Sequence, residues 1–265
     1  MLKSRLCIAF FAFAVGCAPA QKPLTDYVNP MLGTATLWDS VDLGFKPTKR
    51  TWGAEVFPGS SLPNAMVQVS PVTKFHSGAG YQYEDSVIYG FTHTNKGHWN
   101  LCHIPLLPVT GTPTPGDYCS PFSHERESAA PGYYQVFLDR YGVDAQLSST
   151  LRCAFHKYTY PAGAAASLLA DLQRSNEHVR AWDIRKEGDN VFAGWQQTGE
   201  KMYFYAVANR PVNGIEPVVE GDREVRIVRF GEGDGALELR IGFSFVSEKN
   251  ARENLEAEML GKSFA

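Results

Sequence analysis

The side chains best suited to chemistry are concentrated in residues 89–110. This stretch holds three of the seven histidines, a tryptophan, two asparagines and a cysteine, and residues 104–109 form an apolar run. The pattern is typical of a polar loop displayed by a buried strand, which is where binding groups gather. It predicts either a ligand site or a surface loop whose histidines form local hydrogen bonds. The candidate substrate-binding residues are His93, Asn95, His98, Trp99, Asn100 and His103.

The three histidines of this stretch are spaced by five residues. In a strand this odd step places successive rings on opposite faces, and on a helix it turns them by more than a right angle. Neither geometry gathers the ligands of a metal ion, so only an irregular loop could do so. The sequence therefore assigns no metal-binding residue.

Paired carboxyl groups could perform acid–base hydrolysis, which requires one of the two to stay protonated. The candidate pairs are Glu84 with Asp85 and Glu125 with Glu127. Both pairs lie in polar segments, where nothing raises the pKa of one carboxyl group. No nucleophile elbow, phosphate loop or dinucleotide motif is present either. We therefore assign no catalytic residue.

Short strand patterns with turn residues between them must position these groups. Their regular spacing without helices predicts a mainly β fold, an antiparallel β-sandwich. The glycine-rich segment 231–235 is expected to be a hairpin tip. The predicted strands are 66–69, 133–138, 143–149, 153–160, 167–172, 179–184, 191–195, 202–207, 224–230 and 237–245.

The last residues predict a helix over 248–260, capped by Ser247 and ended by Gly261. Ala251, Leu255 and Met259 form one apolar stripe along it. Because burial of such side chains is favourable, we expect a partner domain to cover this stripe. The stripe is then at least partly exposed in the isolated chain.

The chain begins like a secretory signal peptide, with Lys3 and Arg5 before an apolar run over residues 6–15. Residues 14–17 resemble a lipoprotein box in which Cys17 carries the lipid, whereas residues 18–20 fit ordinary cleavage before Gln21. Either route predicts an extracytoplasmic location, in the periplasm or as an outer-membrane lipoprotein. The expected organisation is a signal peptide (1–20), an N-terminal β-sandwich domain (21–246) and a linker helix (247–265).

The charge of the chain narrows the classes of molecule that it binds, and its cysteine content limits its disulfides. Removing the two basic leader residues leaves about 23 basic against 28 acidic residues, without basic runs, which argues against nucleic acid. Cys102, Cys119 and Cys153 allow at most one disulfide, and we expect buried free thiols.

Several phrases, in order along residues 25–260, resemble the N-terminal domain of glycoside hydrolase family 92, the bacterial exo-α-mannosidases. They are YVNPMLGT (27–34), VFPGS (56–60), MVQVSP (66–71), GYQY (80–83), GFTHT (90–94), FSH (122–124), APGYY (130–134), GFSFVS (242–247) and NLEAE (254–258). The chain departs from the family at residues 95–100, where NKGHWN replaces a stretch like HLSGTG, and at residues 74–79, which lack a tryptophan.

The resemblance implies a galactose-mutarotase-like supersandwich, followed in the family by a helical linker and a large helical toroid. It implies α-mannoside hydrolysis with inversion and a calcium requirement, with the acid, the base and most calcium ligands in the toroid. This chain alone is then expected to be inactive. Its partners would be a mannose-containing glycan and the absent toroid.

The resemblance also implies that the loop after GFTHT faces the sugar pocket. There Trp99 would offer an aromatic face to a pyranose ring, and His98 and Asn100 would contact its hydroxyl groups. The alternative places Trp99 in the core. Two other functions stay open from the residues alone, a free-standing carbohydrate-binding module and a structural envelope lipoprotein.

Overall fold

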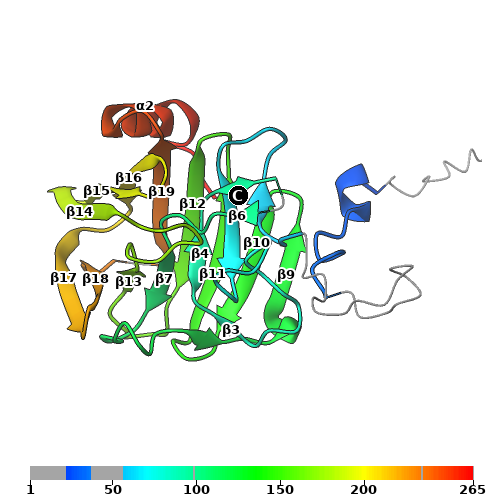
Figure 1. Ribbon diagram of the computed structural model, residues 1–265, viewed down its shortest axis with the longest axis horizontal. Helices are drawn as coiled ribbons and strands as arrows, with labels where there is room; N and C mark the ends of the chain where they lie inside the picture. Colours follow the sequence, from blue (N-terminus) through cyan, green and yellow to red (C-terminus); the bar gives the residue numbers. More distant parts are fainter. Residues whose placement is uncertain (1–21, 37–55, 98, 234, 265) are drawn as a thin grey trace, which may run out of the picture.

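The protein is a sandwich of two antiparallel sheets, seen in a computed structural model that describes residues 22–36, 56–97, 99–233 and 235–264 (Figure 1). One sheet has the strand order β1 (Ser60–Ser61), β2 (Gln68–Val72), β4 (Gly90–Thr92), β7 (Leu106–Val109), β13 (Ser167–Ala170), β18 (Arg223–Phe230) and β17 (Val212–Glu220). The other has the order β14 (Ala181–Gly188), β15 (Val191–Gln197), β16 (Lys201–Ala208), β19 (Leu237–Ser244), β12 (Cys153–Thr159), β11 (Val143–Ser149), β10 (Tyr133–Leu138) and β9 (Glu127–Ala130). The predicted mainly β, antiparallel sandwich is confirmed.

Smaller elements decorate the two sheets. They are the strand pairs β3 (Val87–Ile88) with β8 (Ser120–Pro121) and β5 (Asn95–Lys96) with β6 (Trp99–Asn100), and the 3-10 helices η1 (Leu24–Tyr27) and η2 (His124–Arg126). The β5–β6 hairpin rises from the end of β4 and leads into β7. The candidate loop therefore connects two neighbouring strands of the smaller sheet.

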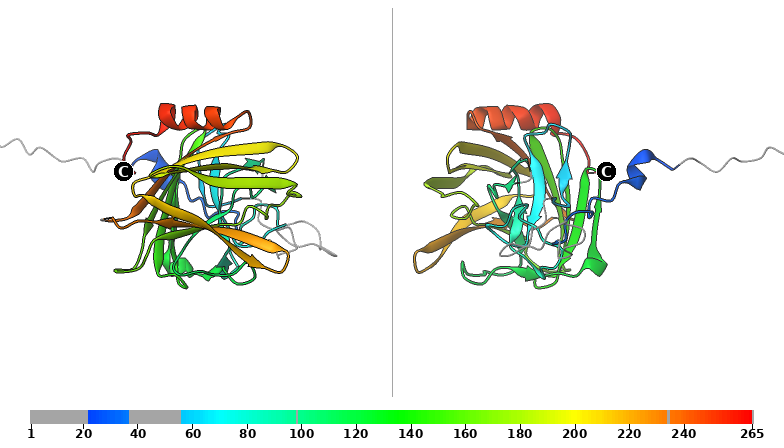
Figure 2. Two further views of the ribbon diagram at one scale, coloured as in Figure 1. Left: turned by 90° about the vertical axis from the view of Figure 1, so that its left-hand side faces the viewer. Right: turned by 45° about the vertical axis from the view of Figure 1, so that its right-hand side comes forward.

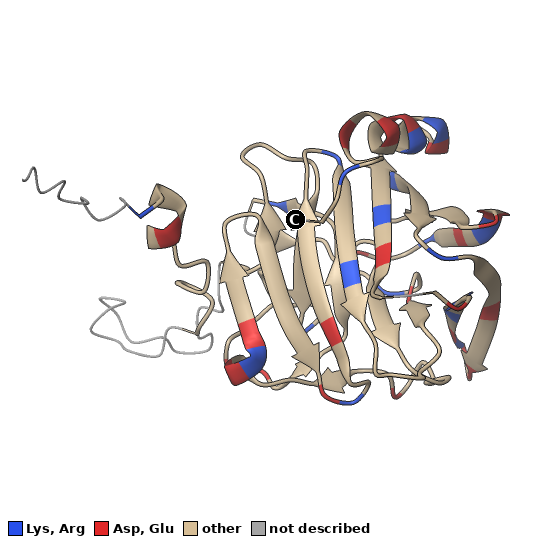
Figure 3. Cartoon of the chain, turned by 180° about the vertical axis from the view of Figure 1, so that it is seen from behind, with Lys and Arg blue, Asp and Glu red and all other residues tan. Residues whose placement is uncertain are grey.

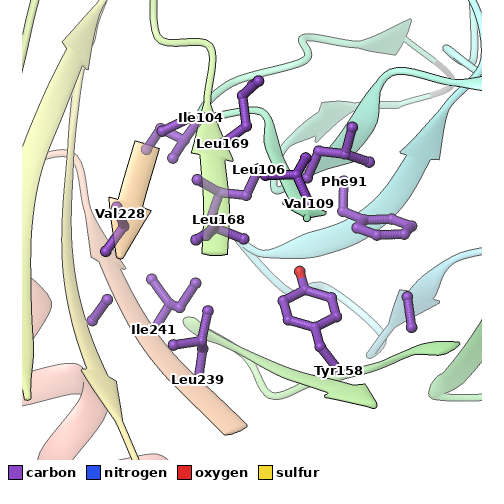
Figure 4. Packing of buried hydrophobic residues seen from close by; sticks show 14 of the residues in the cluster. Phe91, Ile104, Leu106, Val109, Tyr158, Leu168, Leu169, Val228, Leu239 and Ile241 are labelled. Atoms are coloured by element: carbon purple, nitrogen blue, oxygen red, sulfur yellow. The ribbon is translucent and has the colours of Figure 1, made fainter. Parts of the chain in front are cut away.

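Alternating side chains explain why the strands face each other. In β10, β11 and β16 every second residue is buried, because successive side chains of a strand point to opposite faces. By contrast, β7 and β13 are buried throughout. Figure 4 shows side chains from both sheets meeting in the core, with Leu168 of β13 near Ile241 of β19 and Phe91 of β4 near Tyr158 of β12. This core fixes the ends of the strands from which the loops emerge.

Strand prediction succeeds where the alternation is strong and misses several strands, the edge strand β17 among them. The predicted segments 133–138 and 143–149 coincide with β10 and β11. Strand β17, by contrast, was not predicted, because Gly214 and Pro217 interrupt its pattern and most of its side chains are exposed. Proline lacks an N–H group and is tolerated at a sheet edge, and β17 pairs with β18 alone among the named strands.

The connection over residues 231–235 differs from its prediction. It follows β18, which pairs with β13 and β17, and precedes β19, which pairs with β16 and β12. The segment therefore crosses from one sheet to the other and is not a hairpin tip. Two strands adjacent in sequence belong to different layers here, and local sequence patterns do not report that.

The C-terminal helix α2 (Glu248–Glu258) lies across β16, β19 and β12, on the outer side of the larger sheet (Figures 1 and 2). Ser247 caps it as predicted, because its hydroxyl oxygen accepts a hydrogen bond from the Asn250 N–H at 3.1 Å. Within the described part of the chain, no helix has the length and apolar character to cross a bilayer.

The predicted exposure of the helix stripe is wrong. Ala251, Leu255 and Met259 are all buried, and Leu255 and Met259 pack against Cys153 and Phe155 of β12. Gly242 of β19 makes this possible, since a Cβ atom there would lie 2.1 Å from the Ala251 carbonyl oxygen. The missing side chain lets the helix backbone lie directly on the sheet, so the stripe is covered by this chain itself.

Charged residues of both signs are interspersed in the fold, and the thiols of the described residues are free. Lys, Arg, Asp and Glu are mixed along α2 and scattered over the strands (Figure 3). Cys102 and Cys153 are buried free thiols as predicted, whereas Cys119 is a half-buried free thiol.

Candidate functional site

The β5–β6 hairpin carries the central predicted residue, Trp99, at the surface. Trp99 is 55% exposed and pairs across the hairpin with Lys96, next to the pair formed by Asn95 and Asn100. The alternative that placed Trp99 in the core does not hold. His98 lies outside the described residues.

Asn100 holds the loop together from inside. Its side-chain oxygen accepts a hydrogen bond from the Cys102 N–H at 2.7 Å, and its side-chain nitrogen donates to the Thr92 hydroxyl at 3.1 Å. The residue is 1% exposed. Its amide therefore shapes the loop, although Asn100 also borders the cavity described below.

His93 follows β4 and His103 precedes β7, at adjacent ends of two neighbouring strands. His93 is fully buried between the sheets, with its Nε2 atom 3.1 Å from that of His156. His103 instead turns toward the loop that follows β13, where its Nε2 atom lies 3.0 Å from Glu177 Oε2. Within the described residues, no three His, Cys, Asp or Glu side chains come together in a way that could hold a metal ion.

Two adjoining cavities lie beside the hairpin. The smaller has a volume of about 310 Å³ and is lined by His76, Ser77, Lys96, Trp99, Asn100, Leu101, Asn176 and Glu177. The larger has a volume of about 850 Å³ and is lined by His76, Asn176 and Glu177 together with Gln173, Arg174, Ser175, residues 178–182, Asp222 and Arg223. The two cavities adjoin at three shared residues and are together called the groove, whose lining includes tryptophan, amide and carboxylate side chains.

The second wall of the groove was missed by sequence reasoning. Residues 173–178 were left as the connection between the predicted strands 167–172 and 179–184. Ser175, Asn176, Glu177 and His178 form a polar run after the buried strand β13, which is the same signal that singled out residues 93–103. Applied to both loops, that signal would have found both walls.

Hydrogen bonds lock the two walls together. Asn176 donates from its side-chain nitrogen to the Asn100 carbonyl oxygen at 2.6 Å, and Ser175 donates to the Leu101 carbonyl oxygen at 2.7 Å. The His76 N–H donates to the Asn176 side-chain oxygen at 2.7 Å. A groove held in this way is preorganised, which reduces the entropy lost on binding a ligand.

The larger cavity has a polar, mixed-charge lining. The Arg174 guanidinium lies 4.0 Å from the ring centre of Phe75, and its Nη1 donates to the Tyr118 hydroxyl at 3.2 Å. Arg223 pairs with the fully buried Asp171 at 2.6 Å. The arginine side chains are thus oriented by aromatic and acidic neighbours beneath the groove.

The carboxylate pairs considered for acid–base chemistry lie elsewhere. Glu127 is nearly inaccessible, and its carboxylate accepts hydrogen bonds from the hydroxyls of Tyr81 at 3.0 Å and Tyr134 at 2.6 Å. His124 Nδ1 lies 2.6 Å from Glu127 Oε2. Glu84 accepts hydrogen bonds from Thr36. Neither glutamate lines the two cavities described above.

Comparison with known proteins decides the family. A family model described as the glycosyl hydrolase family 92 N-terminal domain matches residues 27–252. The chain belongs to this family. No curated protein sequence matches this chain.

Solved structures agree with this assignment. The family GH92 alpha-mannosidase BT3965 from Bacteroides thetaiotaomicron is similar with a TM-score of 0.78 and 25% identity over 92% of this chain. A structure of that protein in complex with mannoimidazole gives a TM-score of 0.77 at 25% identity, again over 92% of this chain. The family GH92 inverting mannosidase BT2199 from Bacteroides thetaiotaomicron VPI-5482 shares the fold, with a TM-score of 0.74 at 22% identity over 92% of this chain. This chain spans only 35–36% of the length of those chains.

The calcium ion that family 92 implies does not fit the described residues. Calcium prefers several oxygen ligands, usually including carboxylates. The described part of the chain offers no cluster of three metal-binding side chains, and Glu177 is hydrogen-bonded to His103 and Thr198. No step of the mechanism is therefore assigned to calcium in this domain.

Proposed function

We propose that this family 92 domain is the N-terminal sandwich of a secreted glycoside hydrolase that acts on α-mannosides. Its groove forms one wall of the sugar pocket. The family match and the similarity to BT3965, whose structure contains mannoimidazole, support a sugar as the ligand. Both favour a domain of a hydrolase over a free-standing carbohydrate-binding module or an envelope protein.

One observation carries the proposal. Trp99 is exposed at the border of a cavity of about 310 Å³ whose other lining groups include Asn176 and Glu177. Sugars present apolar C–H faces and a rim of hydroxyl groups, so they suit a site that combines an aromatic ring with a few placed polar groups. In this arrangement Trp99 covers the ring face, while the polar side chains of the second wall receive or donate hydrogen bonds.

Of the predicted binding residues, Trp99 is exposed on the hairpin, whereas both polar side-chain atoms of Asn95 are buried without a hydrogen-bond partner among the described residues, and His98 lies outside those residues. Asn100 and His103 act from behind the groove surface, where they hold the loop and Glu177 respectively. His93 lies deeper, against His156. We propose that these last three residues contribute to binding by shaping the site.

Bond cleavage needs groups that the groove lacks. Inverting hydrolysis requires a protonated acid and a base on opposite faces of the sugar. Among the described residues, the carboxylates that line the cavities are Glu177 and Asp222. We propose that the acid, the base and any calcium ion come from a helical domain that closes over the groove.

The leader supports a location outside the cytoplasm. Residues 1–20 lie outside the described part of the chain, so the proposal rests on their sequence. Cleavage before Cys17 would produce a lipid-anchored protein, whereas cleavage before Gln21 would release a free one. Labelling of the expressed protein by palmitate, and its loss in Cys17→Ser, distinguishes the two routes.

The test of the sugar wall is Trp99→Ala, with Trp195→Ala as the matched control. Trp195 is half-buried on β15 and lines neither cavity. Because Trp99 is 55% exposed, its removal should leave the melting temperature nearly unchanged but abolish binding of methyl α-mannoside, measured by ligand-observed NMR. Unchanged binding by Trp99→Ala, or loss of binding only in Trp195→Ala, would contradict the proposal.

A further inference from the structure

Glu177 is the carboxylate that the two cavities share. Its side chain is 42% exposed, and its Oε2 atom accepts a hydrogen bond from the Thr198 hydroxyl at 2.6 Å. His103 Nε2 lies 3.0 Å from the same oxygen. Among the described residues, no donor is bonded to Oε1. One oxygen is therefore anchored to the protein and the other is available to a ligand.

The partners of His103 determine where its proton lies. Nε2 faces Glu177, and the ionised carboxylate can only accept hydrogen bonds, so Nε2 carries the proton. Nδ1 lies 2.9 Å from the Thr94 hydroxyl and accepts its hydrogen bond. Burial lowers the pKa of His103, although Glu177 opposes that effect. The ring is a neutral donor with a fixed orientation.

The backbone beside His103 is strained. Cys102 and Ile104 have φ values of 53° and 52°, in the left-handed region that β-branched residues avoid. The Ile104 N–H donates to Gln196 at 2.8 Å, and Gln196 donates to the Leu172 and Arg174 carbonyl oxygens at 3.0 Å. Strain of this kind persists where surrounding contacts enforce it, and it clusters at functional sites. Here the contacts of Gln196 enforce the backbone of residues 102–104 and so place His103 beside Glu177.

We propose that Glu177 selects the ligand of the groove by accepting hydrogen bonds from two adjacent hydroxyl groups of a neutral pyranose, and that His103 is its positioning residue. This inference rests on the proposed sugar-binding function. A carboxylate has about four acceptor positions. Thr198 and His103 occupy two of them on Oε2, so the two on Oε1 match a pair of neighbouring hydroxyls.

The charge of Glu177 sets the ligand class. Hydrogen bonds from Thr198, followed by those from His103, hold the pKa of Glu177 below its ordinary value, so the group is ionised near neutral pH. Lys96 of the hairpin also acts on Glu177 and favours its ionised form, while His76 lines both cavities and His178 lines the larger one. An ionised carboxylate favours hydroxyl donors and repels a uronic acid or phosphate placed at the same point.

The main experiment compares the full chain with Glu177→Gln, using Glu253→Gln on α2 as a control of similar exposure. Glutamine keeps the shape but removes the charge. Binding of methyl α-mannoside should weaken about tenfold or more in Glu177→Gln and stay unchanged in Glu253→Gln. Two monodeoxy analogues of methyl α-mannoside, which lack hydroxyl groups at neighbouring ring positions, should each bind the wild type about tenfold more weakly than methyl α-mannoside does. On Glu177→Gln the same two analogues should bind as tightly as methyl α-mannoside.

His103 is tested by rescue and by pH. His103→Gln retains an amide donor for Glu177 and should bind within about threefold of the wild type, whereas His103→Leu should bind about tenfold more weakly. The acid midpoint for loss of binding should rise in His103→Leu, because Glu177 loses a donor that favours its ionised form. If His103→Leu does not fold, His103→Gln alone tests the role of His103. Loss of binding in His103→Gln would then show that His103 is not a positioning residue.

The outcomes separate the two proposals. If the wild type binds and Glu177→Gln binds equally well, the role of Glu177 is overturned while the sugar wall stands. If the wild type fails to bind methyl α-mannoside at all, both proposals fail. Equal weakening of His103→Gln and His103→Leu, with an unchanged acid midpoint, would show that His103 only supports the fold.

Discussion

His93 and His156 meet inside the sandwich, with their Nε2 atoms 3.1 Å apart. His156 Nδ1 lies 2.6 Å from the Tyr158 hydroxyl, so a chain of three polar groups crosses an apolar core. Burial lowers the pKa of His93 to about 3 and the pKa of His156 well below its ordinary value. The two rings are therefore neutral in the folded protein.

This pair predicts loss of stability in mild acid. In the unfolded chain a histidine takes up a proton near its ordinary pKa of 6.5, whereas folded His93 does so only near about 3. The unfolded state then binds more protons, and the free energy of unfolding falls as pH drops below that ordinary value. Urea unfolding at pH 7, 6 and 5 measures this before most carboxylates titrate.

The double variant His93→Phe, His156→Phe provides the control. It removes both groups, so its free energy of unfolding should decline less between pH 7 and 5 than that of the wild type. An equal decline in the two proteins would show that other groups cause the acid sensitivity.

Gly242 predicts a specific sensitivity of the helix seat. A Cβ atom there would lie 2.1 Å from the Ala251 carbonyl oxygen and 2.9 Å from the Leu255 nitrogen. Gly242→Ala should therefore destabilise the fold by about 1–3 kcal/mol and increase amide exchange in α2. Gly199→Ala is the control, because nothing lies within 4 Å of its added methyl group. Equal stability of the two variants would contradict the close approach of helix and sheet.

The chain alone should not hydrolyse an aryl α-mannoside. The carboxylates lining the groove are Glu177 and Asp222, and hydrogen bonds keep the pKa of Glu177 below its ordinary value, which is unsuitable for a general acid at neutral pH. Release of nitrophenol from 4-nitrophenyl α-mannoside measures the activity. Turnover that disappears in Glu177→Gln or Asp222→Asn would place a catalytic group in this domain.

The sequence could predict strands where burial alternates, as in β10 and β11, because that period is a local property. It could not predict that Gly242 lets α2 lie on the sheet, since this depends on contact between residues distant in sequence. The same limit applies to the site. The polar composition of residues 93–103 indicated one wall, but only the fold shows that Glu177 lies beside His103.

The most direct test of the sugar wall is a titration of the ¹⁵N-labelled chain with methyl α-mannoside, followed by two-dimensional NMR. The indole N–H of Trp99 and the side-chain amide of Asn176 report on the two walls of the smaller cavity. The account predicts saturable shifts of both signals and of backbone amides near Lys96 and Glu177, with Trp195 unaffected. No shifts at these positions at saturating sugar, or shifts confined to the outer face of β15 and β16, would contradict it.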